Sequence, residues 1–332
     1  MNKPRALFLD KTSLFPDDLD FSILESIANW HWIDNAGVDA SCVRQGYGDA
    51  EIIVTNKVIV SKADIEANIA ENGHLKLICV AATGVNNVDI AAAQQHGIKV
   101  CNVRGYATSS VAQHVFSLIL ALNRKLFSYQ QSVNDGSWSE SDFFCYFGSP
   151  ISGLEGKTLG IVGYGELGQA VAKLAKCFAM EVLIAHAHNA GDGVRNKADL
   201  SDGRVDLMTL LSESDVVSLH CPLTENNRHM ISEKELSVMK TDAILVNAAR
   251  GGLIDEQALL SALKNAEIGA AALDVLEEEP PSVENPLVSY RQDNLIITPH
   301  IAWASSESRQ KLVNEIAKNI QAYLQGQLRN IV

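Results

Sequence analysis

A glycine-rich turn between an apolar strand and a helical run constrains the fold of this chain more than any other feature. The strand predicted over Thr158–Val162 runs directly into Gly163, Gly165 and Gly168, which follow the spacing G-x-G-x-x-G. In this context the first glycine allows a tight turn, the second lets the backbone approach a pyrophosphate, and the third permits close packing of helix on sheet. The free N–H groups at the start of the helix favour phosphate oxygens. The residues expected to contact a dinucleotide here are Gly163, Gly165, Glu166, Leu167 and Gly168.

The segments around this turn predict parallel sheets, because short apolar runs alternate with helical periodicity along most of the chain. Four runs precede the turn and are predicted strands: Ala6–Leu9, Ile52–Thr55, Leu77–Val80 and Ile98–Cys101. Six further strands are predicted from Thr158 onward, and six is the strand count of a dinucleotide-binding sheet. They are Thr158–Val162, Val182–Ala185, Val216–Leu219, Ile244–Val246, Ala270–Leu273 and Leu295–Ile297. Helices are expected over Asp89–Gln95, from Thr108 to Asn134 without a break, and over Ser305–Gly326.

Chain length and charge restrict the class of protein. A chain of 332 residues exceeds one ordinary core, so two domains are expected. The net charge of −13, with no cluster of Lys and Arg, disfavours nucleic acid and anionic membranes as partners, although one local Arg suffices to bind a small anion. The longest apolar stretch, Val115–Leu122, is far shorter than the roughly 20 residues of a membrane span, and no secretory leader is evident. A cytoplasmic location is therefore expected.

The six cysteines are expected to be free thiols. They are scattered, with no C-x-x-C pair and no histidine at metal-ligand spacing, so neither a disulfide framework nor a metal site is predicted.

The choice between NAD and NADP stays open. An acidic residue at the end of the second strand of such a domain binds the 2′-hydroxyl of the adenosine ribose. Here that strand ends in Ala185 and His186, without an acid, which removes a barrier to NADP. No Arg is adjacent to bind a 2′-phosphate either, since Arg195 and Lys197 lie further on. NAD is the expected cofactor, with NADP as the alternative and His186 as a cofactor-binding residue.

Three polar residues follow apolar strands late in the same domain. Arg250 follows Ile244–Val246, Glu279 lies in an acidic run after Ala270–Leu273, and His300 follows Leu295–Ile297. Ligands bind beyond the carboxyl ends of parallel strands, so these side chains are expected at one crevice. A bidentate Arg suits a carboxylate, a His suits proton transfer, and a neighbouring carboxylate favours the protonated His. Together they predict reduction of a 2-keto acid by hydride transfer.

Each of the three also has a structural interpretation. Arg250 could be a turn residue in an ion pair, His300 could cap a strand end, and the run Glu277–Glu279 could be a solvated face. The pattern of residues alone does not decide which of the three glutamates accompanies the His.

With these motifs in place, the chain resembles the D-isomer-specific 2-hydroxyacid dehydrogenase family from end to end, and glycerate dehydrogenase/hydroxypyruvate reductases most closely within it. The segments that carry the resemblance are Ala82–Asp89, Val111–His114, Gly163–Gly168, His220–Thr224, Asn247–Gly251, Leu273–Pro280 and Thr298–Trp303. The resemblance implies that Arg250 anchors the substrate, that Glu279 partners the His, and that His300 is the acid/base. It implies substrate contacts from Thr83, Gly84 and Val85. The further cofactor contacts that it implies are Thr108, Cys221, Pro222, Ala248, Ala249, Asp274 and His300.

The resemblance also implies an α/β architecture of two Rossmann-like domains with parallel sheets and a cleft between them. The flavodoxin-like substrate domain would comprise residues 1–103 and 303–332, and the dinucleotide-binding domain residues 104–302. It implies a homodimer with the region from Thr108 to Asn134 at the interface. The favoured reactions are reduction of hydroxypyruvate or glyoxylate to D-glycerate or glycolate. A phosphoglycerate dehydrogenase-like enzyme and a non-enzymatic, NAD-sensing protein resembling corepressors of this fold remain as alternatives.

Overall fold

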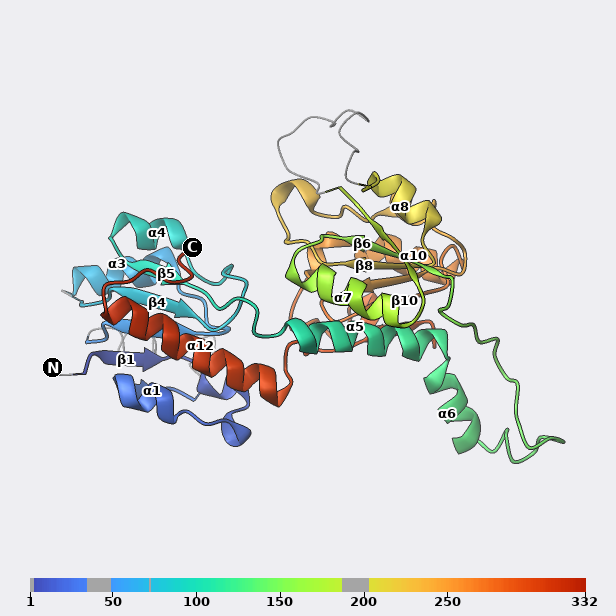
Figure 1. The fold of residues 1–332 in the computed structure, drawn as a ribbon, viewed down its shortest axis with the longest axis horizontal. Helices are drawn as coiled ribbons and strands as arrows, with labels where there is room; N and C mark the ends of the chain where they lie inside the picture. Colours follow the sequence, from blue (N-terminus) through green and yellow to red (C-terminus); the bar gives the residue numbers. More distant parts are fainter. Residues whose placement is uncertain (1–2, 35–48, 72, 187–202) are drawn as a thin grey trace. The chain divides into compact units, whose positions relative to one another are not determined.

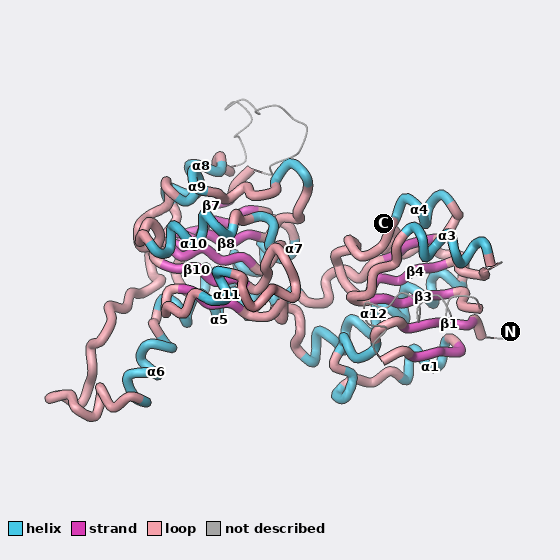
Figure 2. Tube along the Cα trace, turned by 180° about the vertical axis from the view of Figure 1, so that it is seen from behind, coloured by secondary structure: helices cyan, strands magenta, loops and turns pink. Residues whose placement is uncertain are grey.

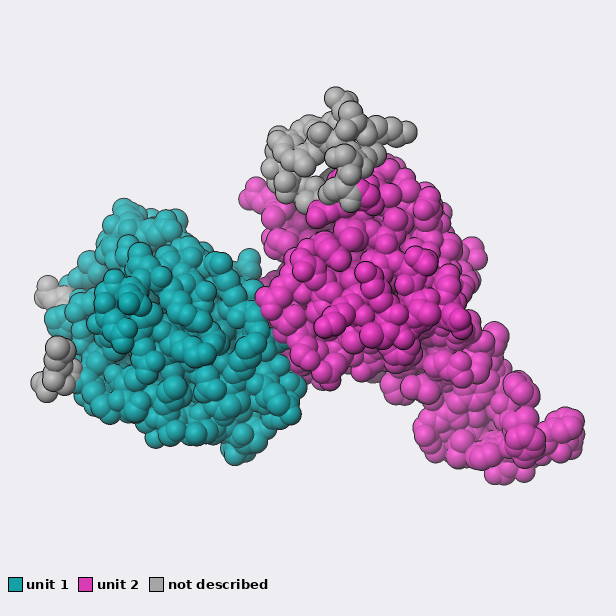
Figure 3. All heavy atoms as spheres, viewed as in Figure 1, with its two compact units in different colours: residues 1–107, 304–332 teal, residues 108–303 magenta. Residues whose placement is uncertain are grey.

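The computed structural model describes residues 3–34, 49–71, 73–186 and 203–332. The chain divides into two compact units, which Figure 3 distinguishes by colour. Unit 1 comprises Met1–Ala107 and Ala304–Val332, and unit 2 comprises Thr108–Trp303. Arg195 and Lys197, considered above for a 2′-phosphate, and Cys42 lie outside the described residues.

Unit 1 is built on a parallel sheet with the strand order β2-β1-β3-β4-β5. This is the flavodoxin-like order 2-1-3-4-5, in agreement with the predicted fold class. Its strands are β1 (Arg5–Phe8), β2 (Asn29–Trp32), β3 (Ile52–Thr55), β4 (Leu77–Val80) and β5 (Lys99–Cys101). The edge strand β2 was not predicted, because its sequence Asn-Trp-His-Trp contains no aliphatic run.

Helices cover both faces of this sheet (Figure 1): α1 (Ser22–Ile27), α3 (Lys62–Ala70), α4 (Ile90–Gln95) and α12 (Ser306–Leu324). The last of these comes from the far end of the chain and packs on α1 and β4. Its Arg309 forms a bidentate pair with Asp18, with distances of 2.6 and 2.7 Å, and its Asn319 donates to the Asn102 carbonyl at 2.8 Å. The terminal residue Val332 donates to Val100 at 3.0 Å, so unit 1 is closed by the C-terminal segment.

Unit 2 contains a six-stranded parallel sheet with the order β11-β10-β9-β8-β6-β7. Its strands are β6 (Thr158–Val162), β7 (Glu181–Ile184), β8 (Val216–Leu219), β9 (Ile244–Asn247), β10 (Ala270–Leu273) and β11 (Leu295–Ile297), so all six predicted strands are present. A parallel bridge joins Ala185 to Val205 beyond β7. Counted from β6 as strand 1, β7 is strand 2, the bridge at Val205 takes the place of strand 3, and β8, β9 and β10 are strands 4, 5 and 6. This is the order 3-2-1-4-5-6 of dinucleotide-binding sheets, with β11 added beyond β10. The sheet therefore has the six predicted strands, and Val205 adds an isolated bridge at its edge.

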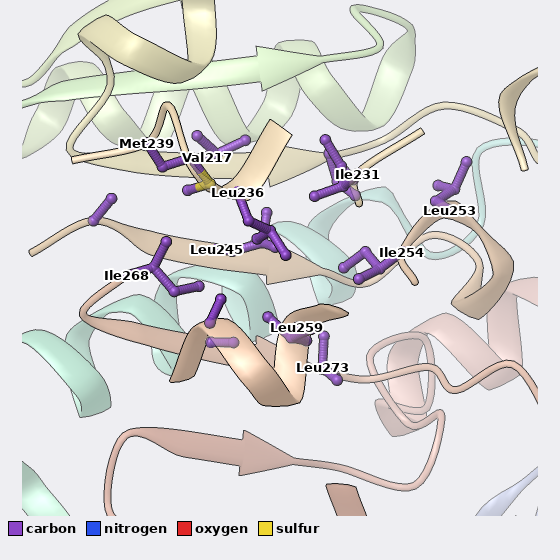
Figure 4. Packing of buried hydrophobic residues seen from close by; sticks show 14 of the residues in the cluster. Val217, Ile231, Leu236, Met239, Leu245, Leu253, Ile254, Leu259, Ile268 and Leu273 are labelled. Atoms are coloured by element: carbon purple, nitrogen blue, oxygen red, sulfur yellow. The ribbon is translucent and has the colours of Figure 1, made fainter. Parts of the chain in front are cut away.

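The two faces of this sheet carry different helices. On one face α5 (Thr108–Asn123) packs against α7 (Glu166–Cys177) and against β9 and β10. The other face carries α8 (Leu207–Glu213), α9 (Glu233–Leu236), α10 (Glu256–Lys264) and α11 (Pro286–Ser289), seen from behind in Figure 2. Between these helices and the strands lies an apolar core to which Val217, Leu245, Leu259 and Leu273 contribute, each almost fully buried (Figure 4).

The long helix predicted from Thr108 to Asn134 is wrong in one respect. The chain breaks into α5 and α6 (Leu126–Asn134), because Lys125 adopts a left-handed conformation with φ 52°. No Gly or Pro marks this break in the sequence. Together α6 and residues 135–152 form an arm of unit 2 that leaves the body of the sheet (Figure 1). Its exposed large apolar side chains are Leu126, Phe127, Val133, Trp138, Phe143, Phe144, Phe147 and Ile151.

No helix in the described part of the chain combines the length and the apolar character needed to cross a bilayer.

Candidate active site

The glycine turn joins β6 to α7, and two of its three glycines are required by the packing of the protein itself. Gly163 has φ 97°, and a Cβ on it would lie 2.6 Å from the Cys221 backbone nitrogen. A Cβ on Gly168 would lie 2.2 Å from the Gly163 carbonyl oxygen. The turn after β6 therefore lies against the turn after β8, at the point where the sheet changes direction. Ligands bind at this switch point in open parallel sheets.

The middle glycine is different, because no contact with the described residues requires a glycine there. Gly165 has φ −78°, which other residues adopt readily, and a Cβ built on it meets no atom of the described residues within 4 Å. It caps α7 without any side-chain hydrogen bond to the first turn of that helix. The open space at a helix N-terminus with free N–H groups fits a bound phosphate. Beside it, Thr108 donates to Glu166 at 2.5 Å, so the structure brings these two predicted residues together.

Two buried imidazole nitrogens next to this turn lack hydrogen-bond partners among the described residues. They are Nδ1 of His220, directly after β8, and Nε2 of His186, at the end of β7. The other ring nitrogen of His220 lies 2.8 Å from the Ser218 hydroxyl. Burial of the ring lowers the pKa of His220 to about 4, so this imidazole is neutral at pH 7 and can pair with a hydroxyl or amide of a ligand. Unpaired buried polar atoms are rare in native proteins, and these two flank β6.

These observations fit a dinucleotide: an open space at the second glycine, a helix N-terminus, and two ring nitrogens at strand ends that have no partner among the described residues. His220 was not among the predicted site residues. The available signal was a polar residue directly after a buried strand. Cys221, which follows it, is partly buried, and Pro222 is exposed. Burial raises the pKa of the Cys221 thiol, so this cysteine is an unreactive thiol at neutral pH.

Arg250 lies in the loop after β9, which Asn247 shapes. The Asn247 amide donates to the Arg250 carbonyl at 2.9 Å and accepts from the Ala249 N–H at 3.0 Å. A Cβ on Gly251 would lie 2.0 Å from the Leu276 backbone, so this loop is packed against the loop after β10. The Arg250 guanidinium donates to the Ala249 carbonyl at 2.6 Å and forms no ion pair within the described part of the chain. A partly exposed guanidinium of this kind can bind an anion.

His300 and Glu279 lie in hydrogen-bond contact. Nδ1 of His300 is 2.7 Å from Oε2 of Glu279, and the other carboxylate oxygen accepts from the Leu276 N–H at 3.0 Å. Each side chain is about one-third exposed, at 34% and 36%. His300 has φ 53°, a left-handed conformation that is uncommon for residues other than glycine. An imidazole held by a carboxylate at one nitrogen can exchange a proton at the other.

Two members of the acidic run contact two different histidines. Glu277 pairs with Arg228 and lies 3.2 Å from Nε2 of His229, while Glu279 reaches His300. The question that the sequence pattern left open therefore has a geometric answer: Glu279 is the member in contact with His300.

Asp274, at the end of β10, is almost fully buried at 1% exposure. One carboxylate oxygen accepts from the Thr298 hydroxyl at 2.6 Å and the Ile301 N–H at 2.9 Å, and the other accepts from the Ala302 N–H at 2.9 Å. Burial alone would raise the pKa of Asp274, but His114, Thr298 and these amides outweigh it and hold the pKa below its usual value. Its expected contact with the cofactor stays a prediction.

The loop Thr83–Val85 follows β4 of unit 1. Its shape is fixed by Thr83, whose hydroxyl donates to the Val103 carbonyl at 2.9 Å and whose carbonyl accepts from Asn102 at 2.7 Å. The backbone N–H groups of Gly84 and Val85 donate to no residue that the structure describes. Free N–H groups of this kind suit an anionic ligand.

Comparisons with known proteins agree with this geometry. Residues 116–302 match the model of the D-isomer specific 2-hydroxyacid dehydrogenase NAD binding domain. The chain is 42% identical to a glycerate dehydrogenase of Methylorubrum extorquens over 99% of this chain and 98% of that protein. It is 36% identical to a hydroxypyruvate reductase of Blautia hydrogenotrophica over 99% of both. Among solved structures it is similar to an acyclic imino acid reductase in complex with NADPH and D-Arg, with a TM-score of 0.84, 29% identity and 99% of both chains covered.

Proposed function

The chain belongs to the D-isomer-specific 2-hydroxyacid dehydrogenase family, and within it we propose that this protein reduces hydroxypyruvate and glyoxylate to D-glycerate and glycolate. As a member of the family it is an NAD(P)-dependent oxidoreductase that interconverts 2-keto and 2-hydroxy acids. The observation that carries the proposal is the pair formed by His300 and Glu279, 2.7 Å apart, together with an Arg250 that has no carboxylate partner among the described residues. The choice of substrate is supported by the similarity to a glycerate dehydrogenase and a hydroxypyruvate reductase.

In the proposed mechanism Arg250 binds the substrate carboxylate through its planar fork. When bound, NADH or NADPH supplies the hydride to the keto carbon. The imidazolium of His300 donates its Nε2 proton to the carbonyl oxygen as the C=O bond becomes C–OH. Glu279 accepts a hydrogen bond from Nδ1, which orients the ring. The reverse reaction uses neutral His300 as the base.

A turnover assay with a matched pair of histidine variants tests this function. Oxidation of NADH and NADPH is followed with hydroxypyruvate, glyoxylate, pyruvate and 3-phosphohydroxypyruvate. His300→Ala should lower kcat by about 10²–10⁴-fold, the usual worth of positioned proton transfer, with NADH binding retained. His229→Ala removes the neighbouring pair of His229 with Glu277 and should leave kcat within about twofold, because it lies outside the proposed reaction.

The outcomes separate the competing functions. A preference for 3-phosphohydroxypyruvate would indicate a phosphoglycerate dehydrogenase-like enzyme. Tight NADH binding without turnover of any 2-keto acid would support the sensing protein instead. Equal turnover by His300→Ala and wild type would refute the role of His300.

We further propose that the arm of unit 2 joins two copies of this chain into a homodimer. Three of its phenylalanines, Phe143, Phe144 and Phe147, are 74%, 92% and 85% exposed, and an apolar surface of this extent marks an interface in a water-soluble protein. Phe143→Ser with Phe144→Ser should shift the mass measured by light scattering from two chains to one. Val283→Ser, which removes an exposed apolar residue outside the arm, is the control. A wild-type monomer would refute this proposal.

A further inference from the structure

The left-handed conformation of His300 is fixed by hydrogen bonds at its own N–H, at its carbonyl and at the N–H groups of the two residues that follow. Its N–H donates to the Asp274 carbonyl at 2.8 Å, and its own carbonyl accepts from the Trp303 indole at 2.9 Å. The next two N–H groups, of Ile301 and Ala302, donate to the two carboxylate oxygens of Asp274. A strained conformation persists only where its surroundings fix it, and at this turn Asp274 is the common partner.

Asp274 is in turn connected to helix α5 by a directed chain of hydrogen bonds. Thr298 donates its only hydroxyl proton to Asp274 at 2.6 Å. Nε2 of His114 lies 3.0 Å from the same hydroxyl oxygen, so His114 must be the donor in that contact. The same imidazole nitrogen is 3.5 Å from the Asp274 carboxylate, and the His114 side chain is only 19% exposed.

A second contact from α5 reaches the same turn. The Ser110 hydroxyl donates to the Ala302 carbonyl at 2.7 Å, one helical turn before His114. The face of α5 that carries Ser110 and His114 is thus bonded to both ends of the segment from Thr298 to Ala302. Since α5 begins at Thr108, beside the glycine turn, this helix connects the dinucleotide site to the turn that carries the imidazole.

We propose that His114 is a positioning residue, which acts through Thr298 and Asp274 to hold His300 in the conformation that reaches Glu279. The proposal rests on the role proposed for His300. It requires no contact of His114 with substrate or cofactor. The hydroxyl of Thr298 is the essential relay, because it is the group that both accepts from His114 and donates to Asp274.

The test uses two variants of the relay and one of the helix. Thr298→Val removes the hydroxyl at nearly constant volume, Thr298→Ser keeps it, and His114→Phe keeps a ring without its donor. We expect Thr298→Val and His114→Phe to lower kcat about 10- to 100-fold, as small misplacements of reacting groups do. The KM for hydroxypyruvate and the Kd for NADH should change less than about twofold, and Thr298→Ser should restore kcat to within about threefold of wild type.

A double-variant cycle distinguishes positioning of His300 from general damage. In a His300→Ala background, Thr298→Val should change the residual kcat by less than about twofold, because the group being positioned is gone. The inference is overturned if Thr298→Val and His114→Phe keep wild-type kcat, if Thr298→Ser is as impaired as Thr298→Val, or if Thr298→Val costs the same factor in both backgrounds. A fully active His300→Ala would overturn the proposed function itself, and this inference with it. His114→Phe keeps the test valid if Thr298→Val does not fold.

Discussion

Alanine substitutions at Gly165 and Gly168 test the dinucleotide site, because one should weaken NADH binding and the other should lower the stability of the fold. In Gly168→Ala the new Cβ would lie 2.2 Å from the Gly163 carbonyl, about 1.2 Å closer than the 3.4 Å of an ordinary contact. The position of a Cβ is set by the backbone and its neighbour is a backbone carbonyl, so α7 must move relative to the turn, and we expect a loss of stability of about 1–3 kcal/mol. In Gly165→Ala the new Cβ meets no atom within 4 Å in the part of the chain that the structure describes, and the unfolding free energy should change by less than about 1 kcal/mol.

In a binding assay Gly165→Ala should be the more impaired of the two variants. A methyl group at Gly165 would occupy space that the pyrophosphate needs, and the same overpacking of about 1–3 kcal/mol corresponds to a 5- to 150-fold rise in Kd. The Kd for NADH is measured by fluorescence titration and stability by thermal unfolding. Gly153→Ala, which also meets no atom within 4 Å, is the control. Wild-type NADH affinity in Gly165→Ala would show that the phosphates do not lie at this turn. An unchanged Tm in Gly168→Ala would show that the packing argument is wrong.

Three further variants test the substrate anchor, the cofactor choice and the titration of a buried imidazole. Arg250→Lys keeps the charge but loses the fork, and should lower kcat/KM for hydroxypyruvate about 10- to 150-fold in steady-state assays. His186→Asp should raise the Kd for NADPH at least about tenfold relative to that for NADH, since a carboxylate repels a 2′-phosphate; equal changes in the two titrations would contradict this. Burial lowers the pKa of His220 from 6.5 to about 4, so the stability it contributes is full above pH 6.5 and is lost as the pH falls towards 4. By pH 5 this loss should be about 2 kcal/mol in urea unfolding, and His220→Asn should not show it.

Most strands of the two sheets could be predicted from the sequence because they are buried on both faces. Such strands are continuous apolar runs, and β8 and β10 were predicted with the observed bounds. The edge strand β2 could not be found this way, since its alternating pattern of two tryptophans with Asn and His is only half-buried. The break at Lys125 was missed for a different reason: a left-handed residue without Gly leaves no compositional signal.

The candidate site was predictable as a set of positions but not as a network. Polar residues after strand ends made Arg250 and His300 candidates, because the ends of parallel strands share one edge. Glu279 needed family spacing, since three adjacent glutamates have the same chemistry and only the fold assigns Glu277 to His229. The contact between His114 and Thr298 could not be predicted from the sequence, because a hydrogen-bond relay between a helix and a turn depends on which residues the fold brings together.

Unit 2 is inserted between the two segments of unit 1, and this connectivity sets an order of folding during synthesis. The whole of unit 2 is synthesised before α12. Until then unit 1 lacks Leu312, Val313, Ile316 and Ile320, which are fully buried in the finished protein, and lacks the bond from Asn319 to Asn102. The N-terminal segment of unit 1 (Met1–Ala107), although translated first, therefore keeps an apolar face uncovered until α12 has been made. Nascent chains of this protein are accordingly expected to be most prone to aggregation before α12 has been added.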